Sequence, residues 1–163
     1  MAIYFFDTSA LVKRYITEPG SALIRQICEA RDSLTDAQSN VIFISEITIV
    51  ESAAAFAILV RTDIIPKRKG KDAYGKFVDQ IEREYRVIGL TRALVRAAAD
   101  LTQNYPLKAY DAMQLAIALD TKNLLKANGI KLVFVSGDDQ LLQAARAEGM
   151  STENPFDHTT LDR

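Results

Sequence analysis

The sequence predicts an α/β sandwich built on a mostly parallel sheet, and two observations lead to this fold class. Short runs of β-branched, aromatic or other apolar residues alternate with longer segments whose apolar residues recur at helical spacing. The chain has 163 residues, 48 % hydrophobic and 25 % charged, which suits one globular domain with its own core. We expect a single domain over residues 1–150 and a C-terminal tail over residues 151–163.

The first expected strand is the apolar run that ends at a single carboxylate, Asp7. Residues 8–15 suit a helix, and the turn cluster at residues 17–20 ends it. The carboxyl end of a central strand faces the crevice where α/β proteins bind ligands, so Asp7 is a candidate site residue. Asp is also a common helix N-cap, and this simpler role stays open for Asp7.

The next elements follow the same alternation of helix and strand. We expect an amphipathic helix with Ser21 as its N-cap and a polar stretch over residues 32–40. The β-branched run at residues 41–45 reads as a second buried strand, and its last residue, Ser45, suits the cap of a helix over residues 47–60.

Glu51 is the one charged residue of the very apolar helix over residues 47–60. An ionised carboxylate is costly to bury unless it is paired, hydrogen-bonded or bound to a metal. Glu51 is therefore expected at a pocket, with a salt bridge to an Arg of another helix as the alternative.

Residues 61–71 are expected to form a basic connection between helices. Such clusters are usually solvated loops, but they would supply phosphate contacts if the chain binds RNA. The residues concerned are Lys67, Arg68, Lys69 and Lys71.

The second half of the chain repeats the pattern. We expect a helix over residues 72–84, a strand over 87–90, a helix capped by Thr91 and a long helix over 107–128. The long helix again embeds one acid, Asp111, among small and apolar residues. Lys108 lies one helical turn before it, and an ordinary ion pair between the two is the simpler interpretation.

The last expected strand, residues 131–136, ends like the first. Ser136 and Gly137 follow the apolar run, and the acids Asp138 and Asp139 open a helix. The only histidine, His158, has no neighbouring histidine or cysteine and is expected at the surface.

Charge and cysteine content limit the possible classes. The net charge of −1 creates no global field for nucleic acid, so any such binding must use a local patch. Cys28 is the only cysteine, no signal-peptide pattern is present and no apolar run is long enough to span a bilayer. We expect a cytoplasmic protein with no membrane association.

Four lone acids meet at one edge of the sheet if the strands lie side by side. Several carboxylates in one crevice raise one another's pKa or require a cation. A set of oxygen ligands without His or Cys selects Mg²⁺ or Mn²⁺, which suits metal-assisted attack of water on a phosphodiester. The four acids are Asp7, Glu51, Asp111 and Asp138.

Four ordered motifs resemble the PIN domain family, specifically its VapC-type toxin ribonucleases. They are D-T-S-A-L-V-K-R-Y at 7–15, I-T-I-V-E-S at 47–52, L-K-A-Y-D-A-M-Q-L-A at 107–116 and V-S-G-D-D-Q-L-L at 135–142. The resemblance covers nearly the whole chain. It implies a three-layer α/β/α sandwich and a metal-dependent endoribonuclease that is inhibited by a cognate antitoxin and commonly forms a homodimer.

The resemblance also implies roles for individual residues. Asp7, Glu51 and Asp111 match the three core acids of the family. Asp138 matches the more variable fourth acid, with Asp139 as the alternative. The supporting hydroxyl residues are Ser9, which would orient Asp7 or a metal-bound water, and Ser136 of the last motif.

The expected mechanism follows from these assignments. The four acids hold Mg²⁺ or Mn²⁺, which activates water for in-line attack on RNA, while Lys108 and the basic connection position the strand. One alternative is a noncatalytic PIN-like module that binds RNA or a protein. Another is a phosphatase or phospho-receiver with Asp7 as nucleophile, although the D-T-S-A motif lacks the second acid of a haloacid-dehalogenase-like phosphatase.

Overall fold

Five strands form one parallel sheet in the structure, a computed structural model that describes residues 1–162. They are β1 (Ile3–Phe6), β2 (Val41–Ser45), β3 (Arg86–Ile88), β4 (Leu132–Val135) and β5 (Ser151–Glu153). Their order is β3-β2-β1-β4-β5, and every pairing is parallel. The predicted α/β fold is confirmed, and β1, which leads into Asp7, is the central strand.

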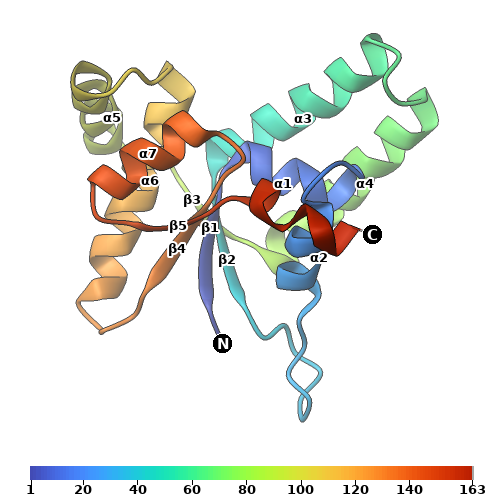
Figure 1. Ribbon diagram of the computed structural model, residues 1–163, viewed down its shortest axis with the longest axis horizontal. Helices are drawn as coiled ribbons and strands as arrows, with labels where there is room; N and C mark the ends of the chain where they lie inside the picture. The colour runs from blue at the N-terminus through green and yellow to red at the C-terminus, as the bar shows by residue number, and fades with distance from the viewer. Residues whose placement is uncertain (163) are drawn as a thin grey trace.

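Helices cover both faces of the sheet. They are α1 (Thr8–Tyr15), α2 (Ser21–Glu29), α3 (Glu46–Arg61), α4 (Lys67–Glu84), α5 (Arg92–Asn104), α6 (Ala109–Lys126), α7 (Asp139–Ala147) and a 3₁₀ segment, η1 (Pro155–Asp162). In Figure 1, α5, α6 and α7 lie on one side of the sheet, and α1, α2 and α4 on the other. The three-layer sandwich is therefore confirmed. Among the described residues, no helix has the length and hydropathy that crossing a membrane requires.

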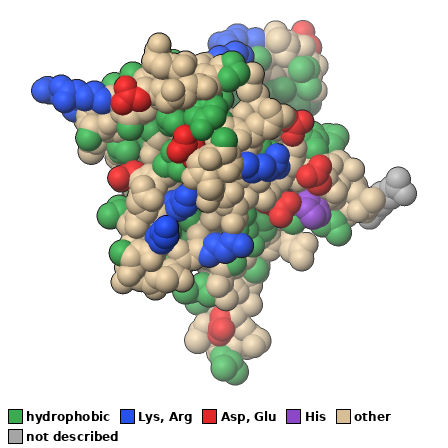
Figure 2. Space-filling view, turned by 60° about the vertical axis from the view of Figure 1, so that its left-hand side comes forward, with side chains coloured by type: hydrophobic (Ala, Val, Ile, Leu, Met, Phe, Trp, Pro, Cys, Tyr) green, Lys and Arg blue, Asp and Glu red, His purple; other side chains and the backbone are tan. Residues whose placement is uncertain are grey.

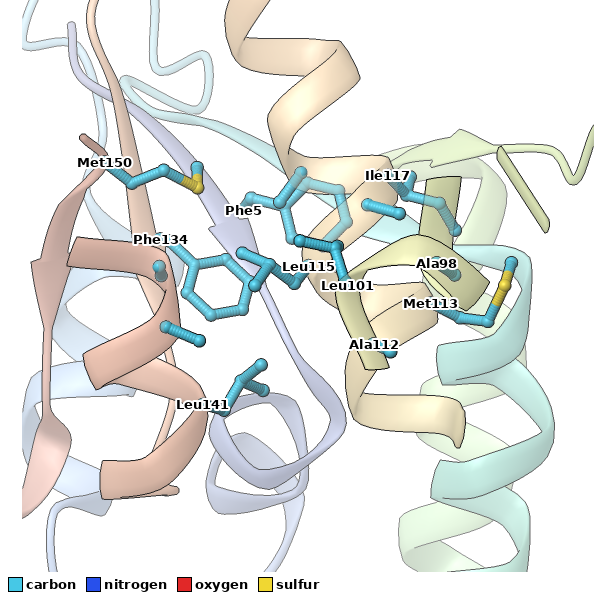
Figure 3. Close-up of a cluster of buried hydrophobic side chains, with 14 of the residues drawn as sticks. Phe5, Ala98, Leu101, Ala112, Met113, Leu115, Ile117, Phe134, Leu141 and Met150 are labelled. Carbon is cyan, nitrogen blue, oxygen red and sulfur yellow. The ribbon is translucent and has the colours of Figure 1, made fainter. Parts of the chain in front are cut away.

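Successive residues of β1 enter two separate cores. Phe5 packs with α5, α6 and α7 in the core shown in Figure 3, where Phe134 of β4 lies beside it. Phe6 enters the core on the other face, with α1, α2 and α4. Both Phe5 and Phe6 are fully buried, because a parallel sheet is covered on both faces. This burial explains why β1 reads as one continuous apolar run.

The basic connection expected over residues 61–71 is mostly helical, so its assignment as a loop is wrong. Arg61 ends α3 and Lys67 begins α4, which leaves only residues 62–66 between the helices. Pro66 precedes α4 with φ −61°, a geometry already suited to starting a helix, and Lys and Arg are good helix formers. The four basic residues thus lie on the first turns of α4.

The segment beyond residue 150 is built into the fold rather than left as a tail. Residues 151–153 pair with β4 as the edge strand β5, and η1 packs against α2 (Figure 1). The sequence S-T-E of β5 contains no apolar residue, so hydrophobic patterning did not reveal it. His158 is partly exposed and bonds to Glu153 at 2.7 Å.

The start of α2 also departs from expectation. Gly20, with φ +85°, is the N-cap, and Ser21 is the first helical residue. The cap comes from the far end of the chain, since the Asp162 carboxylate accepts hydrogen bonds from the backbone N–H of Gly20 (2.6 Å) and of Ala22 (2.8 Å). A Cβ at residue 20 would lie 2.7 Å from the Pro155 carbonyl oxygen, so glycine is required for this close approach.

Candidate active site

A cleft of about 500 Å³ opens beside the carboxyl ends of β1 and β4. The structure brings all four candidate acids to it, each from a different connection or helix. They are Asp7 after β1, Glu51 in α3, Asp111 in α6 and Asp138 after β4. The convergence follows from the parallel topology, which puts the carboxyl ends of the strands at one edge of the sheet.

Asp7 is held as both an N-cap and a cleft residue. Its Oδ1 accepts a hydrogen bond from the backbone N–H of Ala10 at 2.9 Å, so the simpler capping role is real. Ser9 donates to both carboxylate oxygens, at 2.8 and 2.9 Å, and Ser136 donates to Oδ2 at 2.7 Å. Both supporting serines thus contact Asp7 and fix its orientation.

Asp7 is only 5 % exposed, and the burial of its carboxyl raises the pKa to about 6. The hydrogen bonds from Ala10, Ser136 and Ser9 oppose this rise, and the negative charge of Glu51 adds to it. Because this pKa is close to neutral, the ionised carboxylate of Asp7 lowers the stability of the folded protein. Such a residue is typical of a functional site.

Glu51 is bound by neutral polar side chains instead of an Arg. Its Oε2 accepts hydrogen bonds from the Thr8 hydroxyl at 2.5 Å and from the Gln114 amide at 2.9 Å. Gln114 is buried and also donates to Thr48 at 2.9 Å. Among residues 1–162, no salt bridge includes Glu51, so the expected alternative of an Arg partner is wrong.

Thr8 and Gln114 are site residues that sequence reasoning missed. The signal for Gln114 was present, because it is a polar residue inside the same apolar stretch of α6 that embeds Asp111. Its role depends on α3 lying alongside α6, which the local pattern does not show.

Asp111 and Asp138 form the more open side of the cleft. Asp111 is half-buried, and its pKa is raised by burial and by the charges of Asp138 and Glu51, while Lys108 opposes the rise. Asp138 caps α7 by accepting from the Leu141 N–H at 2.9 Å. Asp139 accepts a hydrogen bond from Asn154 of the connection after β5 and does not line the cleft. Of these two acids, the structure therefore places only Asp138 at the cleft.

The sequence match decides the family. Residues 4–147 match the family model of the PIN domain. The chain belongs to the PIN domain family. No curated protein sequence matches it.

Solved structures share this PIN fold over almost the whole chain. FitAcB from Neisseria gonorrhoeae is 16 % identical with a TM-score of 0.60, covering 94 % of this chain and 98 % of that one. A toxin–antitoxin complex from Klebsiella pneumoniae is 17 % identical with a TM-score of 0.56, covering 95 % and 98 %. Mycobacterium tuberculosis VapC20, a toxin that cleaves the sarcin-ricin loop, is 14 % identical with a TM-score of 0.57, covering 86 % and 94 %.

The donor set of this PIN domain suits a hard divalent cation. The four acids offer only oxygen atoms, which Mg²⁺ and Mn²⁺ prefer, and the charges that raise the pKa of Asp111 would be offset by a cation. Within residues 1–162, no three Asp, Glu, His or Cys side chains lie close enough together to hold a metal ion without moving. Asp7 and Glu51 are fixed by hydrogen bonds, so Asp111 and Asp138 would have to close the set.

Basic residues near the cleft differ from those expected. Lys108 is exposed at the start of α6, and it forms no salt bridge with Asp111 among the described residues. Lys13 of α1, which no sequence pattern indicated, lines the cleft and pairs with Glu18 at 2.9 Å. Its side chain is only 3 % exposed.

The basic residues of α4 do not line the cleft. Lys67 and Lys71 border a separate apolar hollow between α3 and α4, and Arg68 pairs with Asp72 at 3.8 Å. On the face in Figure 2, Lys and Arg side chains are dispersed among acidic and apolar ones. Lys13 is buried and paired with Glu18, so the exposed Lys108, whose charge acts on Asp111, is better placed for a phosphate contact near the four acids.

Proposed function

We propose that this PIN-domain protein is a cytoplasmic endoribonuclease that depends on Mg²⁺ or Mn²⁺ and acts as the toxin of a toxin–antitoxin pair. The observation that supports it most is the convergence of four carboxylates from separate parts of the chain on one cleft. Of these, the most buried, Asp7, has both oxygens engaged by hydrogen bonds, which suits a fixed ligand better than a phosphate-accepting nucleophile.

The proposed mechanism gives the chain's own residues three tasks. Asp7, oriented by Ser9 and Ser136, and Glu51, oriented by Thr8 and Gln114, would hold the metal from the rigid side of the cleft. Asp111 and Asp138 would hold it from the open side. When bound, the ion supplies an activated water and charge compensation for the leaving oxygen.

Partners enter the proposal through the structural neighbours. One neighbour is a toxin–antitoxin complex and another is named as a toxin, so we propose a cognate antitoxin for this chain. A homodimer is proposed on the family resemblance, and RNA is proposed as the substrate.

Glu51→Gln tests the fixed side of the site. We expect cleavage of RNA to fall about 100-fold or more, equal to roughly 2.7 kcal/mol in transition-state free energy. The melting temperature should stay nearly unchanged, because the Gln amide oxygen still accepts the hydrogen bonds from Thr8 and Gln114. Cleavage rates and thermal unfolding of the same preparation check the expected loss of activity and the unchanged melting temperature. Full activity in the variant would show that Glu51 is not part of the site.

The fourth acid is tested by a matched pair, Asp138→Asn and Asp139→Asn. Asn caps helices as well as Asp, so α7 is kept in the first variant. With a pool of structured RNA and Mg²⁺, Mn²⁺ or chelator, we expect metal-dependent cleavage by the wild type and by Asp139→Asn, and about 100-fold less by Asp138→Asn.

Two results would contradict the proposal in different ways. If Asp138→Asn cleaves RNA as fast as Asp139→Asn and the wild type, Asp138 is not part of the site. Absence of cleavage by folded, antitoxin-free wild type with either metal favours the noncatalytic binding module, which footprinting on bound RNA then identifies.

A further inference from the structure

The C-terminal segment builds one wall of the cleft, although it lies outside residues 4–147 that match the family model. Phe156 of η1 lines the cleft together with the four acids, and the residue is 45 % exposed. Large aromatic residues usually bury their rings, and this ring lies at the site instead. Figure 1 shows η1 lying against α1 and α2 beside the carboxyl ends of the strands.

The Phe156 ring is held in place from two sides. The Lys13 ammonium group lies 3.9 Å from the ring centroid, a cation–π contact, while it also pairs with Glu18. On the loop after β4, a Cβ at Gly137 would lie 2.9 Å from the ring carbon Cε2, so only glycine lets the ring sit this close.

The backbone around Phe156 is fastened as well. The buried side chain of Asn154 accepts a hydrogen bond from the Phe156 N–H at 3.0 Å and donates to Asp139 at 2.9 Å. At the other end of η1, Asp162 binds the amides that start α2. The ring is therefore preorganised, and a ligand that contacts it loses little conformational entropy on binding.

We propose that Phe156 is a stacking platform for a nucleobase of single-stranded RNA beside the scissile phosphate, and that Lys13 is the positioning residue that holds the ring. The inference rests on the proposed ribonuclease function. Aromatic side chains are the usual stacking partners of unpaired bases, and the contact tolerates any base because every base has a π-face. A cation held by the four acids of the same cleft would favour the phosphate that follows the stacked base.

The chemistry of the cleft favours a base over an apolar protein side chain. The cleft that the ring lines contains apolar side chains such as Ile58 and Leu59, but it also contains all four acids, and Lys13 lies against the ring. An apolar protein segment inserted there would have to desolvate the four carboxylates, whereas a nucleotide brings a phosphate that would pair with a cation held by them.

The test compares ring chemistry at one position with base chemistry in the substrate. The variants are Phe156→Trp, Phe156→Leu and Lys13→Met, and the substrates are single-stranded RNA oligonucleotides with one abasic nucleotide placed in turn on each side of the cleavage site. We expect Phe156→Leu to lower kcat/KM about 5- to 150-fold and Phe156→Trp to keep it. Leu keeps an apolar wall, so a merely structural role predicts no such difference.

The abasic substrates test whether the Phe156 ring and one base of the RNA contact each other. At one position the missing base should slow the wild type by a similar factor and leave Phe156→Leu unaffected, because the contact is already lost. Lys13→Met should show a reduced abasic penalty. The inference is overturned if Phe156→Leu is as active as wild type. It is also overturned if the missing base slows Phe156→Leu as much as it slows the wild type. Neither result contradicts the proposed nuclease activity.

Binding separates the failure of this inference from the failure of the proposed function. If wild type cleaves no RNA, the nuclease proposal fails, and the stacking inference is judged by fluorescence anisotropy of the same oligonucleotides with Ca²⁺ in place of Mg²⁺. Weaker binding of intact RNA by Phe156→Leu, with equal binding of the abasic RNA, supports stacking. Unchanged RNA binding together with weakened binding of a purified antitoxin overturns it in favour of a protein contact.

Discussion

Asp7→Asn is expected to abolish metal-dependent RNA cleavage and, in the same protein, to raise the free energy of unfolding at neutral pH. The loss of activity follows from removing a charged oxygen donor at the centre of the proposed metal site, on the central strand. We expect a fall beyond about 1000-fold, equal to roughly 4 kcal/mol.

The gain in stability follows from the raised pKa of Asp7. The unfolded carboxyl titrates near 3.8, and burial raises the folded value to about 6. Between these two values the native protein retains a proton that the unfolded chain has lost, so stability falls as the pH rises through this window. The total fall is about 3 kcal/mol for a shift of about two units. Asn does not ionise, so this loss is absent from the variant.

Chemical denaturation of the metal-free protein in chelator, at several pH values from 4 to 8, checks the prediction. The wild-type curve should drop relative to that of Asp7→Asn across the window and run parallel to it above about pH 7. Asp139→Asn, which changes an acid outside the cleft, serves as the control and should follow the wild type. Parallel curves for wild type and Asp7→Asn throughout would show that Asp7 is not destabilised by burial.

Arg14→Met is expected to destabilise the fold by about 3–5 kcal/mol, because it leaves a partly buried carboxylate without its partner. Arg14 lies on the face of α1 opposite the cleft, and its buried guanidinium bonds to Glu84 and to the hydroxyl of Tyr85. Tyr85 in turn bonds to Tyr15 at 2.7 Å. The cluster joins α1, which presents the cleft residues, to the end of α4.

A double-mutant cycle with Glu84→Gln isolates the ion pair from the packing of the Arg14 stem. The double variant should lose less stability than the sum of the two single variants, because no unpaired charge remains. Arg68→Met is the matched control. Arg68 is 94 % exposed and pairs with Asp72 only at 3.8 Å, so its loss should cost at most about 1 kcal/mol. A cost of that small size for Arg14→Met would show that the buried pair contributes little.

The sequence by itself determined the parts of the fold that depend on local pattern. Continuous apolar runs identified four of the strands because a parallel sheet buries both faces, and two of these runs, β1 and β4, lead into acids that line the cleft. Asp7 and Asp138 were recognisable from this position, and Glu51 and Asp111 from their isolation in apolar helices. The structure brings these four acids to one cleft.

Only the tertiary structure decided which groups contact one another across long sequence separations. Thr8 and Gln114 hold Glu51, Asn154 draws Asp139 away from the cleft, and Asp162 caps a helix that begins about 140 residues earlier. The same holds for β5 and for Lys13 beneath Phe156. A polar residue takes its role from the partner that folding brings to it, and periodicity along the chain contains no information about that partner. Hydrophobic spacing therefore predicted the layers and the edge of the sheet, while hydrogen bonds and charges between distant segments defined the site.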